Sequence, residues 1–132
     1  MRSKMEQSEN IMGIQHLGLP TRDMAATLRF YKGLGFEVAL QTRNDGAAVN
    51  FFRLKNLTIE AYESPDAVQM PGAIDHIALE VADIGDAFAM AKQSGFDLLD
   101  QEVQFLPFWE NGVKFFTILG PNAEKIEFSQ KL

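Results

Sequence analysis

Residues 14–38 read IQHLGLPTRDMAATLRFYKGLGFEV, and residues 74–98 align with them without a gap as IDHIALEVADIGDAFAMAKQSGFDL. The alignment superposes the only two histidines of the chain, and each copy is followed by a segment that carries an Ile-Glu pair. An internal repeat determines the architecture of a chain, so we expect two similar modules, each with one imidazole and one carboxylate. These four residues are His16 and Glu60 in the first copy and His76 and Glu127 in the second.

Each copy has the pattern of a strand, a helix and further strands. Short apolar runs between turn residues predict the strands. Thr21 or Asp23 is placed to cap the first helix, and Asp83 or Asp86 is placed to cap the second. Glycines at 33, 35 and 95 are typical of the ends of these helices. The predicted strands cover residues 11–19, 36–40, 48–54, 57–63, 74–81, 113–119 and 124–130, and the predicted helices run from about 24 to the glycines at 33–35 and over about 84–94.

The predicted fold is α+β, with two βαβββ modules that form a curled mixed sheet and place their helices on its outer face. We expect residues 1–132 to form a single domain, because this length suits one shared core. The first module covers about 11–63 and the second about 74–130. The segment 64–73 between them contains two prolines and one glycine, which is typical of a linker.

The alternation of side chains along a strand predicts which face carries the polar residues. His16 lies on the face opposite Leu17 and Leu19, and His76 lies opposite Ile77 in the same way. The aliphatic face is expected to pack on the helix, so the histidines face away from it. The same test places Glu60, Glu127 and Glu80 on the face away from the helices.

Composition excludes several classes of function. The chain has 46% hydrophobic residues, which indicates a globular protein, and a net charge of −6, which argues against nucleic acid binding. It contains no cysteine, so disulfides and thiolate metal sites are excluded. No apolar run approaches the ~20 residues needed to span a bilayer, and the N-terminus lacks a secretory signal. We therefore expect a cytoplasmic protein that acts on a small molecule, without nucleic acid or membrane partners.

Two imidazoles and two carboxylates form a suitable ligand set for one divalent metal, such as Zn, Ni, Co, Mn or Fe. A metal there polarises a carbonyl group and stabilises an enediolate, while a neighbouring carboxylate removes the proton. Taken singly, a histidine or glutamate in a strand is more often structural or exposed to solvent, and duplication alone preserves residues by descent. Unpaired carboxylates that face a half-apolar cavity are costly, which favours the metal interpretation.

Aromatic residues are candidates for a substrate pocket. Phe108 and Trp109 lie in the loop-like segment QFLPFWENG, and core packing is the alternative interpretation for them. Phe52 and Phe116 occupy equivalent positions in the two copies and are further candidates. Glu80 is either a second base or a residue at the rim of the pocket.

The paired βαβββ repeat, the four ligand candidates, the FY…LGF helix end and the closing KIEF strand resemble the vicinal oxygen chelate superfamily. This superfamily includes glyoxalase I, bleomycin-resistance proteins and extradiol dioxygenases, and the His/Glu/His/Glu order is most similar to bacterial glyoxalase I (lactoylglutathione lyase). The resemblance implies one divalent metal held by the four residues, with Glu127 and Glu60 moving a proton between adjacent carbons. It also implies a homodimer, because in many relatives each site combines modules of two chains.

The chain departs from glyoxalase I at positions that bind glutathione. Pro20 and Ser64 stand where glyoxalase I typically has an arginine and often has an asparagine. The ligand set therefore predicts a metal-dependent isomerase or lyase without identifying its substrate. Two alternatives remain open, namely an epimerase or sugar-acid isomerase of the same superfamily and a ligand-sequestering protein of the bleomycin-resistance type.

Overall fold

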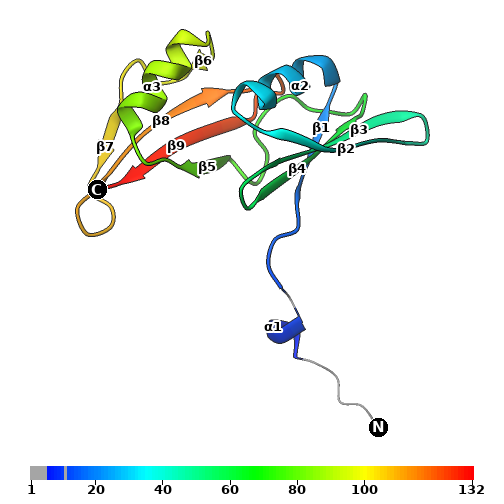
Figure 1. The fold of residues 1–132 in the computed structure, drawn as a ribbon, viewed down its shortest axis with the longest axis horizontal. Coiled ribbons are helices and arrows are strands. Elements are labelled where there is room, and N and C mark those ends of the chain that lie inside the picture. The colour runs from blue at the N-terminus through cyan, green and yellow to red at the C-terminus, as the bar shows by residue number, and fades with distance from the viewer. Residues whose placement is uncertain (1–5, 11) are drawn as a thin grey trace.

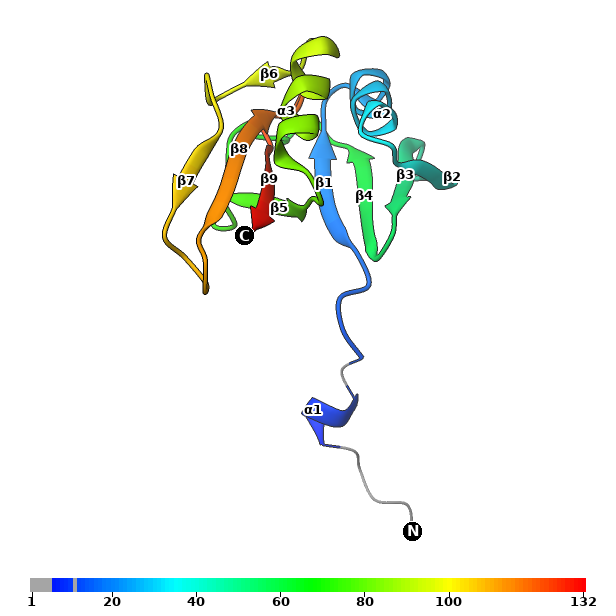
Figure 2. The same ribbon diagram turned by 60° about the vertical axis from the view of Figure 1, so that its left-hand side comes forward.

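The strands form two mixed sheets, one from each repeat (Figure 1). The structure, a computed structural model, describes residues 6–10 and 12–132. A short helix, α1 (Gln7–Asn10), lies on an N-terminal arm that extends away from the sheets (Figures 1 and 2). No helix of the described residues has the length and apolar character needed to cross a bilayer.

Both modules have the same topology. In the first sheet the order is β1-β4-β3-β2, with β1 parallel to β4, and in the second it is β5-β9-β8, with β5 parallel to β9. Strands β6 and β7 both pair with β8. The first module contains β1 (Leu17–Thr21), α2 (Met24–Gly33), β2 (Glu37–Asn44), β3 (Ala47–Leu54) and β4 (Leu57–Glu63), and the second contains β5 (His76–Glu80), α3 (Ile84–Gln93), β6 (Asp97–Leu98), β7 (Gln104–Leu106), β8 (Val113–Leu119) and β9 (Lys125–Lys131).

The α+β class and the repeated strand–helix order agree with the sequence. The strands do not form one continuous sheet, however, because β1 and β5 are each the edge strand of their own sheet. The helices α2 and α3 lie on the same side of the molecule (Figure 2). The opposite face of each sheet is therefore left free of helices.

Local signals set the helix ends. Asp23 caps α2 by accepting a hydrogen bond from the Ala26 N–H at 2.9 Å, and Asp83 caps α3 by accepting one from the Asp86 N–H at 3.0 Å. These two aspartates satisfy N–H groups that have no partner within the helix. The equivalence of the two caps confirms that the repeat extends to the start of each helix.

The first strand of each module is shorter at its start than the sequence indicated. The predicted strand 11–19 begins only at Leu17, and its first residue lies outside the described part of the chain. The strand continues through Pro20 to Thr21, because β1 is an edge strand and an edge tolerates the missing proline N–H. The predicted strand 74–81 is likewise reduced to β5.

One hydrophobic core lies between the sheets and the helices and draws residues from both modules. Phe30 of α2 packs edge-to-face on Phe96, which follows α3, with ring centroids 5.5 Å apart. Tyr31 stacks on Phe52 at 5.4 Å. Aromatic pairs of this kind contribute about 0.5–1.5 kcal/mol beyond the burial of their area. The packing of Phe30 on Phe96 joins the two modules, and the stacking of Tyr31 on Phe52 holds α2 on its own sheet.

Polar contacts reinforce this junction. Asn122, in the β8–β9 loop, donates a hydrogen bond from Nδ2 to Thr27 Oγ1 at 3.0 Å, and Thr27 is also 2.9 Å from Thr21 Oγ1. The Tyr31 hydroxyl donates to Glu124 Oε2 at 2.9 Å. Burial and the neighbouring Glu124 carboxylate raise the pKa of Tyr31 above its usual range, so Tyr31 remains a hydrogen-bond donor. These contacts help to fix the angle between the two modules.

Candidate metal centre

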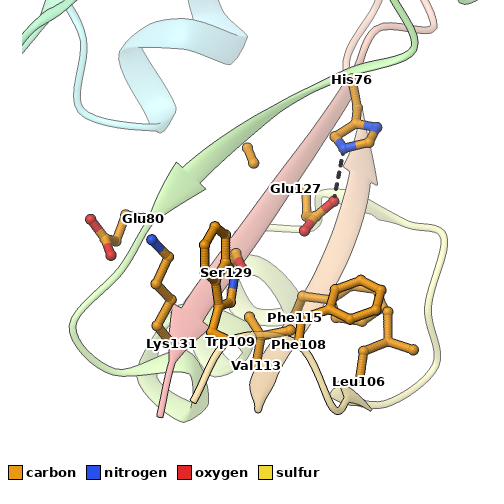
Figure 3. A pocket seen from close by; sticks show the side chains of 11 residues that line it. His76, Glu80, Leu106, Phe108, Trp109, Val113, Phe115, Glu127, Ser129 and Lys131 are labelled. Carbon is orange, nitrogen blue, oxygen red and sulfur yellow. Dashed lines mark ion pairs between the residues drawn. The ribbon is translucent and has the colours of Figure 1, made fainter. Parts of the chain in front are cut away.

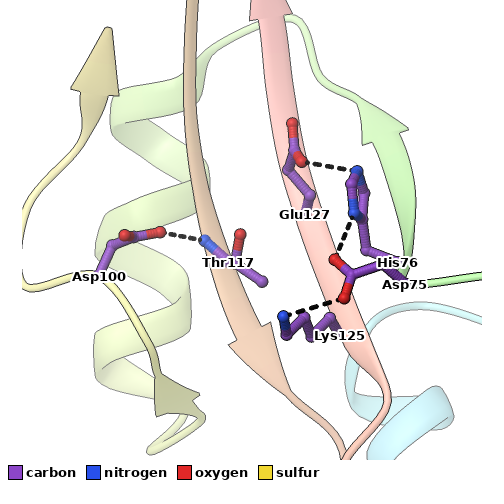
Figure 4. Close-up of polar contacts among 6 residues, drawn as sticks. All are labelled: Asp75, His76, Asp100, Thr117, Lys125 and Glu127. Atoms are coloured by element: carbon purple, nitrogen blue, oxygen red, sulfur yellow. Dashed lines mark hydrogen bonds and ion pairs between the residues drawn. The ribbon is translucent and has the colours of Figure 1, made fainter. Parts of the chain in front are cut away.

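The second module brings His76 and Glu127 together on the face of the sheet that is free of helices. His76 Nε2 lies 3.2 Å from Glu127 Oε2 (Figure 4). The two residues come from neighbouring parallel strands, in which Ala78 is the register partner of Glu127. Because side chains alternate along a strand, His76 points to the same face as Ala78 and therefore to that of Glu127.

The first module repeats this geometry. His16 Nε2 lies 3.4 Å from Glu60 Oε1, and Gly18 is the register partner of Glu60. The histidine therefore precedes the partner of its glutamate by two residues in both modules. The pseudo-symmetry predicted from the repeat extends to the atoms that face each other.

Each histidine faces an oxygen on both of its ring nitrogens. His76 Nδ1 lies 3.0 Å from Asp75 Oδ2, and His16 Nδ1 lies 2.9 Å from Gln15 Oε1. A neutral imidazole has one N–H group and one lone pair. If the Nδ1–H donates to this outer oxygen, the Nε2 lone pair points at the glutamate, and a cation or a second proton is needed between them.

The outer partner of His76 belongs to a larger charged group. Asp75 also forms an ion pair with Lys125 at 3.1 Å (Figure 4). The hydrogen bond from His76 and the neighbouring Lys125 hold the pKa of Asp75 below its usual range. Outer carboxylates of this kind orient a metal-binding imidazole and raise its basicity.

The spacing of each pair fits a metal. Two adjacent ligands on an octahedral ion, with bonds of ~2.1 Å at right angles, are about 3.0 Å apart. The two His–Glu distances, 3.2 and 3.4 Å, are close to this value. The side chains of His16, Glu60, His76 and Glu127 are 33%, 29%, 44% and 21% exposed, so an ion has access to all four.

The four predicted ligands do not converge within one chain. Among the described residues, no group of three or more histidine, aspartate and glutamate side chains is arranged to hold a metal ion. The described structure therefore has two separate His–Glu pairs, one on each sheet. The sequence left open whether the four residues meet within one chain or across a dimer, and within this chain the two pairs lie apart.

A cavity of about 520 Å³ lies beside the His76–Glu127 pair of the second module (Figure 3). Its walls come from the helix-free faces of β5, β8 and β9, from the end of β7 and from the loop between β7 and β8. Phe108 and Trp109 line the cavity from this loop, and Glu80 lines it from β5. The remaining lining residues are His76, Ala78, Leu106, Val113, Phe115, Glu127, Ser129 and Lys131.

Two of the aromatic residues proposed for the pocket lie elsewhere. Phe52 and Phe116 are 0% exposed and belong to the hydrophobic core, because they point to the helix side of their strands. Their neighbours face the opposite side. Phe115 lines the cavity, and the Phe51 ring packs edge-to-face on His16 with centroids 5.6 Å apart. In the β3–β4 hairpin Phe51 pairs with Glu60, so the two side chains share a face. This pairing is the signal that places Phe51, and not Phe52, on the face of the glutamate.

Comparison with known proteins agrees with this fold and its repeat. A family model described as Glyoxalase/Bleomycin resistance protein/Dioxygenase superfamily matches residues 13–121. The chain is 29% identical to the Uncharacterized protein YwbC of Bacillus subtilis strain 168, and the match covers 89% of this chain and 97% of that protein.

Solved structures show the same architecture. The glyoxalase family protein from Enterococcus faecalis matches with a TM-score of 0.77 and 20% identity, over 91% of this chain and 98% of that chain. The fosfomycin resistance protein FosX from Listeria monocytogenes, complexed with Mn(II) and sulfate, matches with a TM-score of 0.72 and 16% identity, over 92% and 94% of the two chains. These two likenesses establish the fold alone.

Proposed function

The chain belongs to the Glyoxalase/Bleomycin resistance protein/Dioxygenase superfamily, and we propose that it is a metal-dependent isomerase or lyase of the glyoxalase I type. The observation that carries this proposal is the presence of one His–Glu pair at metal-ligand spacing in each module. His16, Glu60, His76 and Glu127 would hold one divalent ion, such as Zn, Ni, Co, Mn or Fe. When bound, the ion supplies a Lewis acid that polarises a carbonyl and stabilises the enediolate.

Glu127 is the proposed base. Its carboxylate lies beside His76 in the wall of the cavity and is only 21% exposed, so it reaches a bound substrate while bulk water is partly excluded. Glu127 removes a proton from the carbon next to a carbonyl, and Glu60 or Glu127 itself returns it to the adjacent carbon. The substrate class is a small molecule with oxygens on neighbouring carbons.

The two separate His–Glu pairs support a homodimer in which each complete site uses two chains. Strands β1 and β5 are both edge strands, so their outer backbone groups are free to meet another chain. Ile14 and Ile74, each two residues before its histidine, are 83% and 76% exposed. Placing β1 of one copy next to β5 of the other covers both isoleucines and brings the two His–Glu pairs together.

Mixed dimers test this arrangement. One chain carries His16→Ala and Glu60→Ala, and the other carries His76→Ala and Glu127→Ala. Each chain has a different affinity tag, and the dimer that contains both tags is isolated. We expect this mixed dimer to bind one metal, the wild-type dimer to bind two, and each doubly substituted homodimer to bind none tightly. A mixed dimer without metal contradicts the shared site, and a wild-type protein without stoichiometric metal contradicts the proposed function.

Assays with methylglyoxal address the substrate. Turnover of methylglyoxal that requires glutathione supports the lactoylglutathione lyase assignment, whereas turnover of other α-hydroxycarbonyl compounds supports an epimerase or sugar-acid isomerase. The metal-loaded protein is the form to assay. The Glu127→Gln variant serves as the control, because its amide cannot accept the proton.

A ligand-sequestering protein is the second candidate, and one observation favours it. Phe108 and Trp109 are 56% and 68% exposed, so the cavity presents large aromatic surfaces that a tightly bound ligand would cover. Metal content distinguishes the candidates. A protein that binds aromatic compounds equally well with and without metal supports sequestration, and metal that is lost in His16→Ala and His76→Ala supports the enzyme.

A further inference from the structure

We propose that the cavity of the second module binds a ligand with a flat apolar body and an anionic group, and that Lys131 holds the anion at the end of the cavity opposite the His76–Glu127 pair. This inference rests on the proposed function, which places the chelating oxygens of the ligand at that pair. It adds a substrate class, namely aromatic or similarly flat acids, and a specificity residue.

The cavity has His76 and Glu127 at one end, Glu80 and Lys131 toward the other, and apolar side chains along one wall (Figure 3). Glu127, Ser129 and Lys131 all line it from β9, because alternate residues of a strand share a face. At ~3.3 Å per residue, the Cα atoms of Glu127 and Lys131 are roughly 13 Å apart. A planar ring with a chelating group at one end and an acid at the other fits this span once the side chains reach inward.

Apolar side chains form one wall of the cavity. Phe115 is the register partner of Ser129 and stands beside it on the sheet. Leu106 approaches from the end of β7, and Phe108 and Trp109 approach from the β7–β8 loop; all three are more than one-third exposed. Large aromatic side chains that remain exposed around a concavity with a few polar groups are typical of a small-molecule site.

Lys131 is free to bind an anion. Its ammonium nitrogen lies 4.0 Å from the centroid of the Trp109 ring, which holds it over the cavity. It forms no ion pair with any carboxylate of the described residues. Among the described residues that line the cavity, Lys131 is the only lysine or arginine, and Glu80, the other charged group toward that end, forms no ion pair with it. Lys131 therefore gives this part of the wall its one positive charge for an anionic ligand.

The loop that carries the aromatic wall is held in a constrained conformation. Trp109 has a φ of +64°, in the left-handed region that a residue with a Cβ atom rarely adopts. Gly112 has a φ of +92°, and a Cβ atom there would lie 2.5 Å from the Phe105 ring. A strained residue such as Trp109 persists only where the surrounding structure fixes it, and such residues cluster at binding sites. The indole is therefore positioned before a ligand arrives.

Two matched probes test the inference. 4-Carboxybenzohydroxamate carries two adjacent oxygens for a metal, a benzene ring and an acid, and 4-carbamoylbenzohydroxamate replaces the acid with a neutral amide of the same shape. Trp109 is the only tryptophan of the chain, so quenching of its fluorescence reports binding. We expect the metal-loaded dimer to bind the acid about tenfold more tightly than the amide, the value of one charge-assisted contact.

The Lys131→Met variant should lose this preference while its affinity for the amide, its metal content and its dimeric state stay unchanged. Lys114→Met is the matched control, because Lys114 lies on β8 but does not line the cavity. A preference that persists in Lys131→Met, or a wild-type protein whose fluorescence responds to neither probe, overturns the proposal.

A third probe separates this failure from failure of the proposed function. 4-Carbamoylbenzoate has the ring and the acid but no hydroxamate, so its binding does not require metal. If the protein holds no metal but binds 4-carbamoylbenzoate in a Lys131-dependent manner, the anion site stands and the enzymatic proposal fails. If metal binds at the expected stoichiometry and Lys131→Met changes nothing, the enzymatic proposal stands and the anion site fails.

Discussion

The two modules agree in their His–Glu pairs and differ in what surrounds them. The nitrogen–oxygen distances are 3.4 Å in the first module and 3.2 Å in the second, from strands in the same register. Four residues after the glutamate, however, the first module has Ser64 and the second has Lys131. Under the proposed function, both copies supply metal ligands and the second also supplies the wall that recognises the substrate.

The largest expected effect is a difference in kcat between substitutions of the two glutamates. Glu127→Gln should lower kcat by about 1,000-fold, or about 4 kcal/mol, because it removes the base, while much of the metal remains bound. Glu60→Gln should lower kcat far less, since the proposed role of Glu60 is chiefly that of a ligand and Glu127 itself can return the proton. Steady-state kinetics together with metal analysis of both variants measure this difference. Equal losses in the two variants would show that the carboxylates share the proton transfer.

The next effect contrasts the two faces of one strand. Phe116→Ala should lower the free energy of unfolding by about 3–5 kcal/mol, because it opens a cavity in the core. Phe115→Ala, at a neighbouring position that faces the cavity, should lower it by less than about 1 kcal/mol and should weaken ligand binding instead. Urea denaturation at a fixed protein concentration measures both values. A Phe115 variant as unstable as the Phe116 variant contradicts the assignment of faces.

The two histidines, unlike the two glutamates, are expected to contribute equally. His16→Ala and His76→Ala should weaken metal binding to a similar extent, by about 100-fold or more, because each removes one of the two proposed imidazole ligands. Competition with a metal-binding dye gives both constants. Loss of affinity in only one of the variants would mean that the other module plays no part in the site.

The smallest expected effect concerns the junction between the modules. Tyr31→Phe removes the hydrogen bond to Glu124 and should lower the free energy of unfolding by about 1 kcal/mol. Tyr62→Phe, at a partly exposed tyrosine of β4, is the control and should have little effect. Thermal denaturation of the two variants measures the difference. A larger loss for Tyr62→Phe than for Tyr31→Phe would contradict a stabilising role for the Tyr31–Glu124 hydrogen bond between the modules.

Local sequence signals identified the helices and the polar faces. Asp23 and Asp83 cap the helices as expected, and the alternation of side chains placed His76 and Glu127 on the side without helices. These features depend on neighbours within a few residues of each other along the chain. These features can therefore be predicted from a single segment of sequence.

The errors concern strand register and the relation between segments far apart. The adjacent phenylalanines at 51–52 and 115–116 leave the choice of face open unless the register is used. The two-residue loop Lys55-Asn56 pairs Leu54 with Leu57, and the same register then pairs Phe51 with Glu60. No comparable rule predicts how the two sheets meet, because β1 and β5 form no pair within the chain.

The rigid junction between the modules has a consequence for assembly. In the proposed dimer, β1 of one copy meets β5 of the other, and a head-to-tail contact of this kind can continue from copy to copy as an open filament. It closes after two copies only if both contacts form at once, which requires a fixed angle between the sheets. The packing of Phe30 on Phe96 and the bond from Asn122 to Thr27 supply that angle. In the proposed dimer, the interior of the protein would thereby limit assembly to two copies.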